Sequence, residues 1–288
     1  MSESTELTPA GVRPAIGIVG VGTVGKALVA AFRGTSTLML RDPVLGEDSR
    51  SMADLVEHCE VIFFAVPTPM AANTDVDLTA FESAISELLS AIDASSARPV
   101  VCIKSTVPPD RIARLGVEHP LVRLTMSPEF LREASPIDDM LAMRALVVGG
   151  AEPDTAVVVN LFKNHSNVNG PMRTSTELDA VGAALLKYQQ NCFLATKVSF
   201  MNEFADVLAA SSSTASWEAI QAAFHLDHER MGTSHWRVPG PDGMRGWGGK
   251  CLPKDMAGLR AFAARNGAAT PLLDAVTKRN RSDRNGPD

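Results

Sequence analysis

The segment AIGIVGVGTVG, residues 15–25, decides the fold that we expect for this chain. Its first five residues are typical of a short buried strand, and an apolar helical pattern follows, so the glycines form a GxGxxG motif between strand and helix. In a dinucleotide-binding turn the first glycine makes the tight bend, the second admits a pyrophosphate, and the third lets helix and strand pack closely. Free N–H groups at the helix start favour the phosphates. We therefore expect a cofactor site that includes Gly20, Gly22, Thr23, Val24 and Gly25.

A second expected strand, residues 37–41, ends at Asp42, which lies 17 residues after Gly25. An acidic residue near this position binds the ribose hydroxyls of NAD. Arg41 is a competing signal, because an arginine near this position can accept the 2′-phosphate of NADP instead. We expect Asp42 to bind the cofactor, and we expect NAD rather than NADP.

Strand and helix patterns continue to alternate, as a doubly wound parallel sheet requires. The further strands that we expect cover residues 61–66, 100–103, about 121–125 and 145–148, and the last of these closes the sheet. A helical pattern covers residues 79–92. The expected fold class is therefore α/β, with a Rossmann-type doubly wound parallel sheet.

Polar residues and prolines follow three of these strands. They are Pro67-Thr68-Pro69, Lys104-Ser105-Thr106 and Ser127-Pro128-Glu129. Each could be ordinary turn chemistry, since Thr, Ser and Pro are common in loops, and the next charged residues, Arg132 and Glu133, could be a surface pair. Ligands of such folds bind at the carboxyl edge of the sheet, however, so we treat the three turns as candidate site residues.

An uninterrupted helical pattern covers about residues 174–211 and contains one glycine and no proline. At about 1.5 Å per residue such a helix is on the order of 50 Å long, and helices of this length usually cross between domains or form a dimer seam. Lys187 and Asn191 are four residues apart and project from one face. They are either a solvated lysine beside a neutral amide or a pair of oxyanion donors.

Three glycines lead into a cysteine in the segment GWGGKCLPKD, residues 246–255. Pro253 can open a helix, because the first helical turn does not need its missing N–H. If Cys251 lies just before that turn, backbone N–H groups and Lys250 or Lys254 favour its thiolate. Cys251 is therefore either a nucleophile or, like most unpaired cysteines, a small buried apolar residue.

The composition excludes several classes of function. The chain has 288 residues, a hydrophobic content of 45%, a charged content of 21% and a net charge of −6, so it reads as a soluble globular protein without the basic excess of a nucleic-acid binder. Its four cysteines are widely spaced and its histidines form no ligand pair, so we expect no metal site and no disulfide frame. No signal peptide or membrane-length apolar run is visible, so we expect a cytoplasmic protein with no membrane partner.

We expect four segments along the chain. They are a disordered amino-terminal tail at residues 1–13, an NAD-binding Rossmann domain at 14–173, a helical central domain with the cysteine loop at 174–276, and a polar, frayed tail at 277–288.

Seven motifs in order resemble the UDP-glucose/GDP-mannose dehydrogenase family over about residues 16–280. They are GxGxxG at 20–25, VPTP at 66–69, KSTVP at 104–108, PEFLRE at 128–133, Lys187-xxx-Asn191, DxxRxG at 227–232 and GGxCxPKD at 248–255. Any one of these motifs is weak, but the ordered set is specific. The resemblance implies NAD as cofactor, a homodimer through the long helix, and four-electron oxidation of a primary alcohol of a nucleotide sugar to the carboxylate.

The resemblance also implies a role for each matching residue. Cys251 attacks the aldehyde and forms a thiohemiacetal and then a thioester, and Glu129 activates the water that hydrolyses the thioester. Lys187 and Asn191 hold the oxyanion, Asp255 assists proton transfer, and Thr106 positions substrate or water. The implied cofactor residues are Gly20, Gly22, Thr23, Val24, Gly25, Asp42, Pro67, Thr68, Ser105 and Glu133. The implied substrate residues are Phe130, Leu131, Arg132, Arg230, which would reach a neighbouring subunit, and Gly248.

The sequence departs from the family pattern at three points. Ser127 stands where the family usually has asparagine, and the loop between Arg230 and Cys251 is several residues longer than usual. The sequence stops where typical members begin a third domain that binds UDP or GDP. We therefore expect either a nucleotide sugar or a smaller phosphorylated sugar or nucleoside as substrate.

Two other functions remain open. A single-step NAD-dependent dehydrogenase of the hydroxyacid or phosphogluconate type would share the Rossmann domain and the Lys-xxx-Asn helix, but it has no use for Cys251 or Glu129. A non-catalytic NAD-binding partner subunit is the other alternative, and retention of the whole residue set argues against it.

Overall fold

The computed structural model describes residues 13–71, 76–227, 232 and 234–285 of the chain. These residues form two compact units. The first contains the residues up to 69 and residues 77–187, and the second contains residues 70–76 and those from 188 onward. Most of the tail that we expected at residues 1–13 lies outside the described residues.

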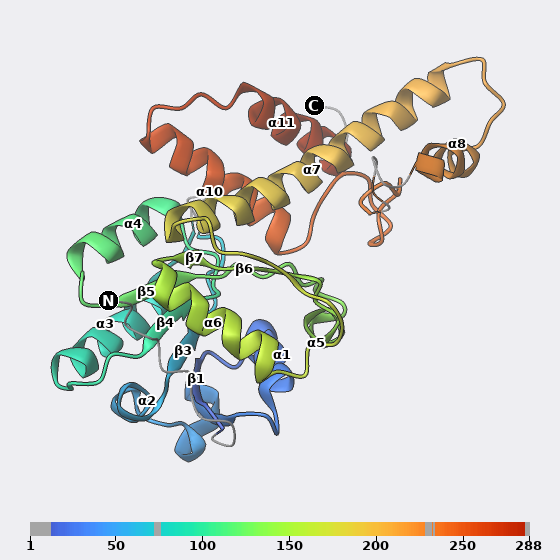
Figure 1. Cartoon of the computed structure of the whole chain (residues 1–288). Coiled ribbons are helices and arrows are strands. Elements are labelled where there is room, and N and C mark those ends of the chain that lie inside the picture. Colours follow the sequence, from blue (N-terminus) through green and yellow to red (C-terminus); the bar gives the residue numbers. More distant parts are fainter. Residues whose placement is uncertain (1–12, 72–75, 228–231, 233, 286–288) are drawn as a thin grey trace. The chain divides into compact units, whose positions relative to one another are not determined.

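The first unit is built on a six-stranded sheet in the order β2-β1-β3-β4-β5-β7 (Figure 1). The strands are β1 (Ala15–Val19), β2 (Thr37–Arg41), β3 (Val61–Phe64), β4 (Val100–Ile103), β5 (Arg123–Met126) and β7 (Gly149–Gly150). The first five are parallel, and β7 pairs antiparallel with β5. The expected α/β fold with a Rossmann-type sheet is therefore confirmed.

Helices cover both faces of this sheet, because successive strand residues point to opposite sides. On β3, Ile62 and Phe64 join one core with α2 (Met52–His58), α3 (Thr79–Asp93) and α4 (Pro109–Glu118). Val61 and Phe63 join the other core with α1 (Thr23–Phe32), α5 (Pro136–Leu141) and α6 (Glu152–Asn164). A short 3₁₀ helix, η1 (Pro43–Asp48), follows β2. Buried apolar residues on both sides of the strands explain why the strands read as continuous apolar runs.

The expectation that residues 145–148 close the sheet is wrong. Residues 145–147 form β6 (Ala145–Val147), which pairs with β8 (Arg173–Ser175) in a separate two-stranded sheet, and β7 closes the main sheet. A Cβ at Gly149 would lie 2.2 Å from the Asp179 oxygen, and one at Gly150 would lie 2.8 Å from the Leu124 oxygen. Only glycines therefore let the chain lie this close to Asp179 at residue 149 and to β5 at residue 150.

The long helix is α7 (Ala180–Ala210), which begins later than the expected residue 174. Residues 173–175 pair with β6 instead, and Asp179 Oδ1 accepts a hydrogen bond of 2.6 Å from the Gly182 N–H in the first turn of α7. Such a side-chain acceptor satisfies an N–H that lacks a helical partner, which sets the helix start. The first turns of α7 contribute Ala183 and Ala184 to the core of the first unit, so the boundary between units lies within α7.

The second unit contains the rest of α7 together with α8 (Trp217–Phe224), η2 (His225–Asp227), α10 (Cys251–Arg265) and α11 (Pro271–Asn285). Its apolar core joins Cys192 and Ala195 of α7 to Met256 of α10 and Val276 of α11, around Trp247. The expected frayed tail is wrong for residues 277–285, which are part of α11. Its polar side chains have specific partners: Arg279 pairs with Asp206 and Asp283, for example.

Candidate functional site

The glycine loop has the geometry that a dinucleotide requires. Gly20 has a φ of +90°, and a Cβ there would lie 2.7 Å from the Ala65 backbone. A Cβ at Gly25 would lie 2.0 Å from the Gly20 oxygen, so α1 packs against the loop only because both residues lack side chains. A Cβ at Gly22 would meet open space, and Gly22 is the N-cap of α1. The open position at the helix start is therefore the one a pyrophosphate would occupy.

Asp42 lies beside this loop at the end of β2. Its Oδ2 accepts a hydrogen bond of 2.6 Å from the Val21 N–H, and its Oδ1 accepts one of 2.9 Å from the Val44 N–H. The carboxylate is held next to the loop by these bonds, and each oxygen keeps a second lone pair for a ribose hydroxyl. Arg41, the competing signal for NADP, forms an ion pair with Glu87 and donates to the Arg50 oxygen at 2.9 Å. The residues present therefore fit NAD.

The candidate residues after β3 and β4 lie at the carboxyl edge of the sheet. Thr68 and Ser105 are buried, while Pro67 is exposed and Thr106 is half-buried. The Ser105 hydroxyl donates to the Val66 oxygen at 2.7 Å, which ties the end of β4 to the end of β3. This bond fixes the edge where ligands of such folds bind.

Glu129, after β5, is paired with Lys187. Lys187 Nζ lies 2.7 Å from the Glu129 backbone oxygen and 3.1 Å from Oε1, and both side chains are largely buried. Glu129 Oε2 accepts a further hydrogen bond of 2.8 Å from the Leu131 N–H. The Lys187 ammonium also lies 5.8 Å from the centre of the Phe130 ring. The first unit therefore joins Glu129, Phe130, Leu131 and Lys187 in one cluster.

Arg132 and Glu133 lie outside that cluster on the exposed side of their segment. Arg132 forms an ion pair with Asp139. The hydrogen bonds that the guanidinium donates lower the pKa of Asp139 to about 2. The residue that pairs with Arg132 therefore belongs to α5. Arg230, the other predicted substrate arginine, lies outside the described residues.

In the second unit Cys251 is the first residue of α10 and is exposed. It follows Gly249, whose φ of +75° ends the loop, and Lys250 is the N-cap of the helix. A cysteine in the first turn lies beside N–H groups that have no helical acceptor, and these favour a thiolate. Pro253 is also in the first turn, as expected.

Asp255 is four residues after Cys251 and therefore lies one turn further along α10. It is buried, and its carboxylate accepts hydrogen bonds from Asn191 Nδ2 through Oδ2 and from Lys254 Nζ at 2.6 Å through Oδ1. Lys254 therefore pairs with Asp255. In the second unit, Asn191 of α7 thus forms one polar cluster with Lys254 and Asp255, which follow Cys251 on α10.

The other three cysteines are buried. Burial raises the pKa of Cys59 and the pKa of Cys192 to about 12, and it raises the pKa of Cys102 as well. Thiols with such values do not form thiolates near neutral pH. Cys251 is therefore the cysteine whose surroundings allow it to react.

Two residues near the site, Lys104 and Asn280, were given no individual role from the sequence. Lys104 is buried, its Nζ lies 3.2 Å from Ser127 Oγ, and burial lowers its pKa. Ser127 Oγ thus accepts the hydrogen bond from this lysine, at the position where the sequence departs from the family pattern. Asn280 of α11 binds the loop before Cys251, as described below. No local sequence pattern marks it, because its partner Trp247 is 33 residues away in the chain.

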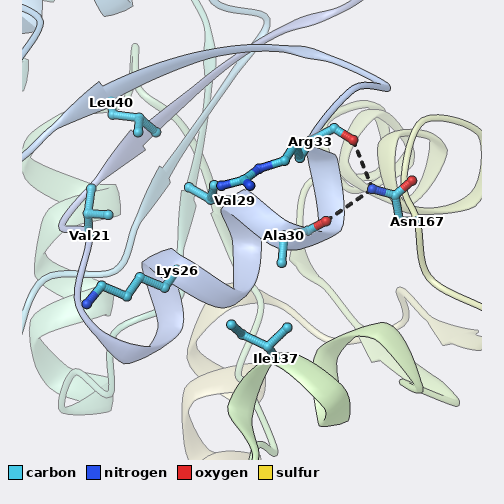
Figure 2. Close-up of a pocket in the computed structure, with 8 residues that line it drawn as sticks. All are labelled: Val21, Lys26, Val29, Ala30, Arg33, Leu40, Ile137 and Asn167. Atoms are coloured by element: carbon cyan, nitrogen blue, oxygen red, sulfur yellow. Dashed lines mark hydrogen bonds between the residues drawn. The ribbon is translucent and has the colours of Figure 1, made fainter. Parts of the chain in front are cut away.

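A pocket of about 570 Å³ lies on the outer side of α1 (Figure 2). Its lining residues are Val21, Lys26, Val29, Ala30, Arg33, Leu40, Ile137 and Asn167. None of the predicted site residues is among them. Among the described residues, no group of three His, Cys, Asp or Glu side chains has the arrangement of a metal site. No helix in the described ranges is long and apolar enough to cross a membrane.

Comparison with known proteins gives matches along most of the chain. The NAD binding domain model of the UDP-glucose/GDP-mannose dehydrogenase family matches residues 46–166, and the central domain model of that family matches residues 182–282. The putative UDP-glucose 6-dehydrogenase YtcA of Bacillus subtilis is 34% identical over 89% of this chain and 58% of its own length. The chain spans about half the length of the curated relatives it matches, from 48% to 58%.

Solved structures give the same result. The UDP-glucose dehydrogenase of Pyrobaculum islandicum aligns with a TM-score of 0.78 and 26% identity over 96% of this chain and 70% of that one. The Mycobacterium tuberculosis 3-hydroxyisobutyrate dehydrogenase aligns with a TM-score of 0.67 over 96% of this chain and 97% of that one, but at 17% identity it shows only a shared fold. The chain belongs to the UDP-glucose/GDP-mannose dehydrogenase family, with its NAD-binding domain and its central domain both present.

Proposed function

We propose that the chain catalyses the NAD-dependent, four-electron oxidation of a primary alcohol to a carboxylate. The observation that carries the proposal is the placement of Cys251: exposed, at the first residue of a helix, after a glycine loop, and one turn before the buried Asp255. A single-step dehydrogenase has no use for such a cysteine. The likeness to a hydroxyacid dehydrogenase is one of fold alone and implies no shared reaction.

The cofactor residues that we propose follow from the glycine loop and its neighbours. Gly22 and the first turn of α1 would hold the pyrophosphate, and Asp42 would bind the ribose. The edge residues Thr68 and Ser105 would line the same site. NAD, when bound, accepts the hydride that the substrate carbon loses in each of the two oxidations.

The residues of the chain divide the chemistry between them. Lys187 and Asn191 would stabilise the negative charge on the substrate oxygen. The Cys251 thiolate would add to the aldehyde carbon formed by the first oxidation, giving a thiohemiacetal, and loss of a hydride from that carbon would leave a thioester. Glu129 would then take a proton from water as the water attacks the thioester carbonyl, which releases the carboxylate and returns the thiol.

The buried contacts support these assignments. Lys187 Nζ is within 3.1 Å of Glu129 Oε1, so the proposed water-activating carboxylate has a cation beside it in the first unit. Asn191 donates to Asp255, so the second proposed oxyanion donor is anchored to the carboxylate one turn from Cys251. Asp255 would in this way orient Asn191 and take part in proton transfer near the cysteine.

The substrate class that we propose is a nucleotide sugar of the UDP-glucose type, by likeness to relatives named UDP-glucose 6-dehydrogenase. A smaller phosphorylated sugar or nucleoside is the alternative, since this chain spans about half of those relatives. We also propose a cytoplasmic location, which the wide spacing of the four cysteines favours.

We propose a homodimer through α7. Phe193, Phe200, Phe204 and Val207 are exposed, and their spacing places them on one face of the helix. Phe200 and Phe204 stack with ring centres 6.3 Å apart. Phe200→Glu should convert a dimer to a monomer in light scattering, while a wild-type monomer would refute the proposal.

Cys251→Ser tests the mechanism. The variant should bind NAD normally and form no carboxylate, because the serine hydroxyl does not ionise near neutral pH as a thiol can. Product analysis with UDP-glucose would show loss of UDP-glucuronate. Acid production at the wild-type rate would refute the role of Cys251.

A further inference from the structure

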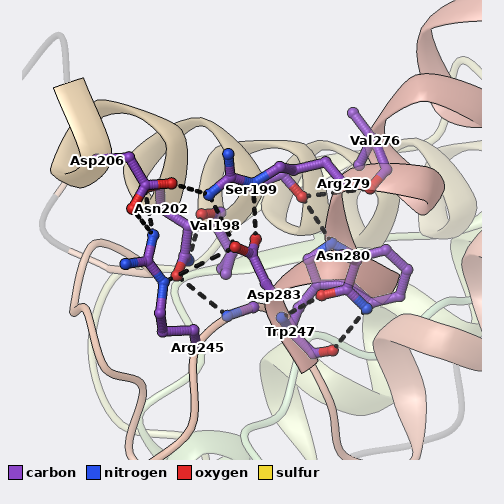
Figure 3. A network of polar contacts seen from close by, with 11 residues as sticks. Val198, Ser199, Asn202, Asp206, Arg245, Trp247, Val276, Arg279, Asn280 and Asp283 are labelled. Atoms are coloured by element: carbon purple, nitrogen blue, oxygen red, sulfur yellow. Dashed lines mark hydrogen bonds and ion pairs between the residues drawn. The ribbon is translucent and has the colours of Figure 1, made fainter. Parts of the chain in front are cut away.

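The loop that precedes Cys251 is held by side chains from two helices. Figure 3 shows Asn202 of α7 and Asn280 of α11 converging on the segment that carries Arg245 and Trp247. We propose that Asn202, Asn280 and Arg284, here called the loop clamp, are positioning residues that set the geometry of Cys251. This inference rests on the proposed role of Cys251 as the nucleophile.

Asn280 binds the backbone of one residue with both ends of its amide. The Trp247 N–H donates to Asn280 Oδ1 at 2.6 Å, and Asn280 Nδ2 donates to the Trp247 oxygen at 3.0 Å. A neighbouring β-strand would bind the backbone N–H and C=O of a residue in the same way, with one acceptor and one donor. Asn280 is buried, so water does not readily replace these bonds.

Asn202 binds the adjoining residue. The Gly246 N–H donates to Asn202 Oδ1 at 3.1 Å, and the Arg245 guanidinium donates to the Asn202 backbone oxygen at 2.7 Å. Three consecutive residues of the loop, 245–247, are therefore bonded to α7 or α11.

The Trp247 side chain also holds the loop. Its indole Nε1 donates to Ser199 Oγ at 2.9 Å, and its ring packs in the apolar core with Met256 of α10. Trp247 is four residues before Cys251, and Met256 is five residues after it. The chain is thus anchored on both sides of the cysteine.

Two of the loop glycines lie directly against clamp side chains. A Cβ at Gly246 would lie 2.4 Å from Asn280 Oδ1, and a Cβ at Gly248 would lie 2.3 Å from Arg284 Nη2. Arg284 is in turn paired with Asp242 at 2.7 Å. The glycines before Cys251 leave room for side chains of α11, which explains why a glycine-rich loop is held in one position.

Displacing a reacting group by about 1 Å can cost about a hundredfold in rate. Removing the Asn280 amide leaves both backbone groups of Trp247 without their partner, so the loop and the first turn of α10 should shift. Cys251 would then lose its alignment with the helix N-terminus, which favours the thiolate by an amount equivalent to about threefold in its population.

The test uses the full chain with Asn280→Ala, and with Asn285→Ala as the matched control. Asn285 is an exposed asparagine on the same helix. Two rates are measured: alkylation of Cys251 by iodoacetamide across pH, followed by peptide mass, and kcat for acid formation. For Asn280→Ala we expect alkylation at pH 7 to fall about threefold with a higher pH midpoint, and kcat to fall about a hundredfold. The Kd for NAD should stay within twofold, because the glycine loop and Asp42 lie in the other unit.

Asn280→Asp and Arg284→Ala keep the test decisive if Asn280→Ala does not fold. Asn280→Asp keeps the acceptor for the Trp247 N–H and should fall between wild type and Asn280→Ala in both rates. Gly248→Ala, whose Cβ would lie 2.3 Å from Arg284 Nη2, and Arg284→Ala should each slow alkylation, because each disturbs the same clamp residue.

The alkylation measurement is independent of turnover, so it separates this inference from the proposed function. If Cys251→Ser still forms acid, the nucleophile assignment fails while the alkylation rates still report on the clamp. A folded Asn280→Ala whose Cys251 alkylates like wild type at every pH would overturn the clamp, whatever the activity.

Discussion

The ammonium of Lys187 lies 2.7 Å from the Glu129 backbone oxygen and 3.1 Å from its Oε1. One lysine therefore holds both the main chain and the carboxylate of the residue that we propose to activate water. Both side chains are largely buried. Removing either one by mutation would therefore leave the other as a buried charge without its ion-pair partner.

Lys187→Met should lower the free energy of unfolding by about 2 kcal/mol, since a buried hydrogen-bonded charge loses its partner. Urea unfolding measures this change. Lys278→Met, at an exposed position on α11, is the control and should leave stability nearly unchanged. In the double variant Lys187→Met/Glu129→Gln the loss should be smaller than the sum of the two single losses, whereas an additive loss would show that the pair is not coupled.

Gly22→Ala should weaken NAD binding without unfolding the protein. The position is open and its backbone φ of −77° suits alanine, but a methyl group there would fill the space that a pyrophosphate needs. We expect the Kd for NAD to rise more than tenfold in calorimetry, with at most about 1 kcal/mol of lost stability from the weaker N-cap. Gly25→Ala is the contrasting variant, because its Cβ would lie 2.0 Å from the Gly20 oxygen and should destabilise the fold itself. Normal NAD binding by Gly22→Ala would refute the placement of the phosphates.

Glu87→Ala should improve NADP binding. Arg41 is paired with Glu87, and release of the guanidinium would make it available to a 2′-phosphate. The pair is partly exposed, so the gain is at most about fivefold in Kd. Arg41→Ala/Glu87→Ala should lose this gain, and an equal gain in the double variant would show that Arg41 is not its source.

Alkylation should select Cys251 over the other three cysteines from pH 7 to pH 9. Burial raises the pKa of Cys59 and of Cys192 to about 12, so roughly one thiol in a thousand is ionised at pH 9. The same raised values mean that ionisation opposes folding: the stability is fully present below the unfolded pKa of about 8.5 and is lost as the pH rises toward 12. Peptide mass after iodoacetamide treatment reads this directly, and modification of Cys192 at the rate of Cys251 would contradict it.

The fold could be predicted where neighbouring residues determine structure. The strand at residues 15–19, the GxGxxG turn and Asp42 form one continuous segment, and the structure places them as its spacing indicates. The closing strand could not be predicted, because β7 depends on close approaches of Gly149 to Asp179 and of Gly150 to Leu124 in space. A two-residue glycine strand has no apolar pattern of its own.

The candidate site shows the same limit. Cys251, Asp255 and Pro253 are close in sequence, so their placement on one helix follows from the spacing. Residues 277–285 contain no apolar residue and read as a tail. Asn280 instead meets Trp247 across a separation of 33 residues. A polar residue whose partner is a distant backbone gives no periodic signal.

The most direct test of the proposed reaction is the number of NADH molecules formed for each molecule of substrate consumed. NADH would be followed by absorbance while substrate loss is followed by chromatography, with UDP-glucose first and its sugar phosphate and nucleoside counterparts after it. The proposed cysteine mechanism predicts two NADH for each substrate and a carboxylate product. One NADH for each substrate, with a carbonyl product, would contradict the four-electron reaction and favour a single-step dehydrogenase.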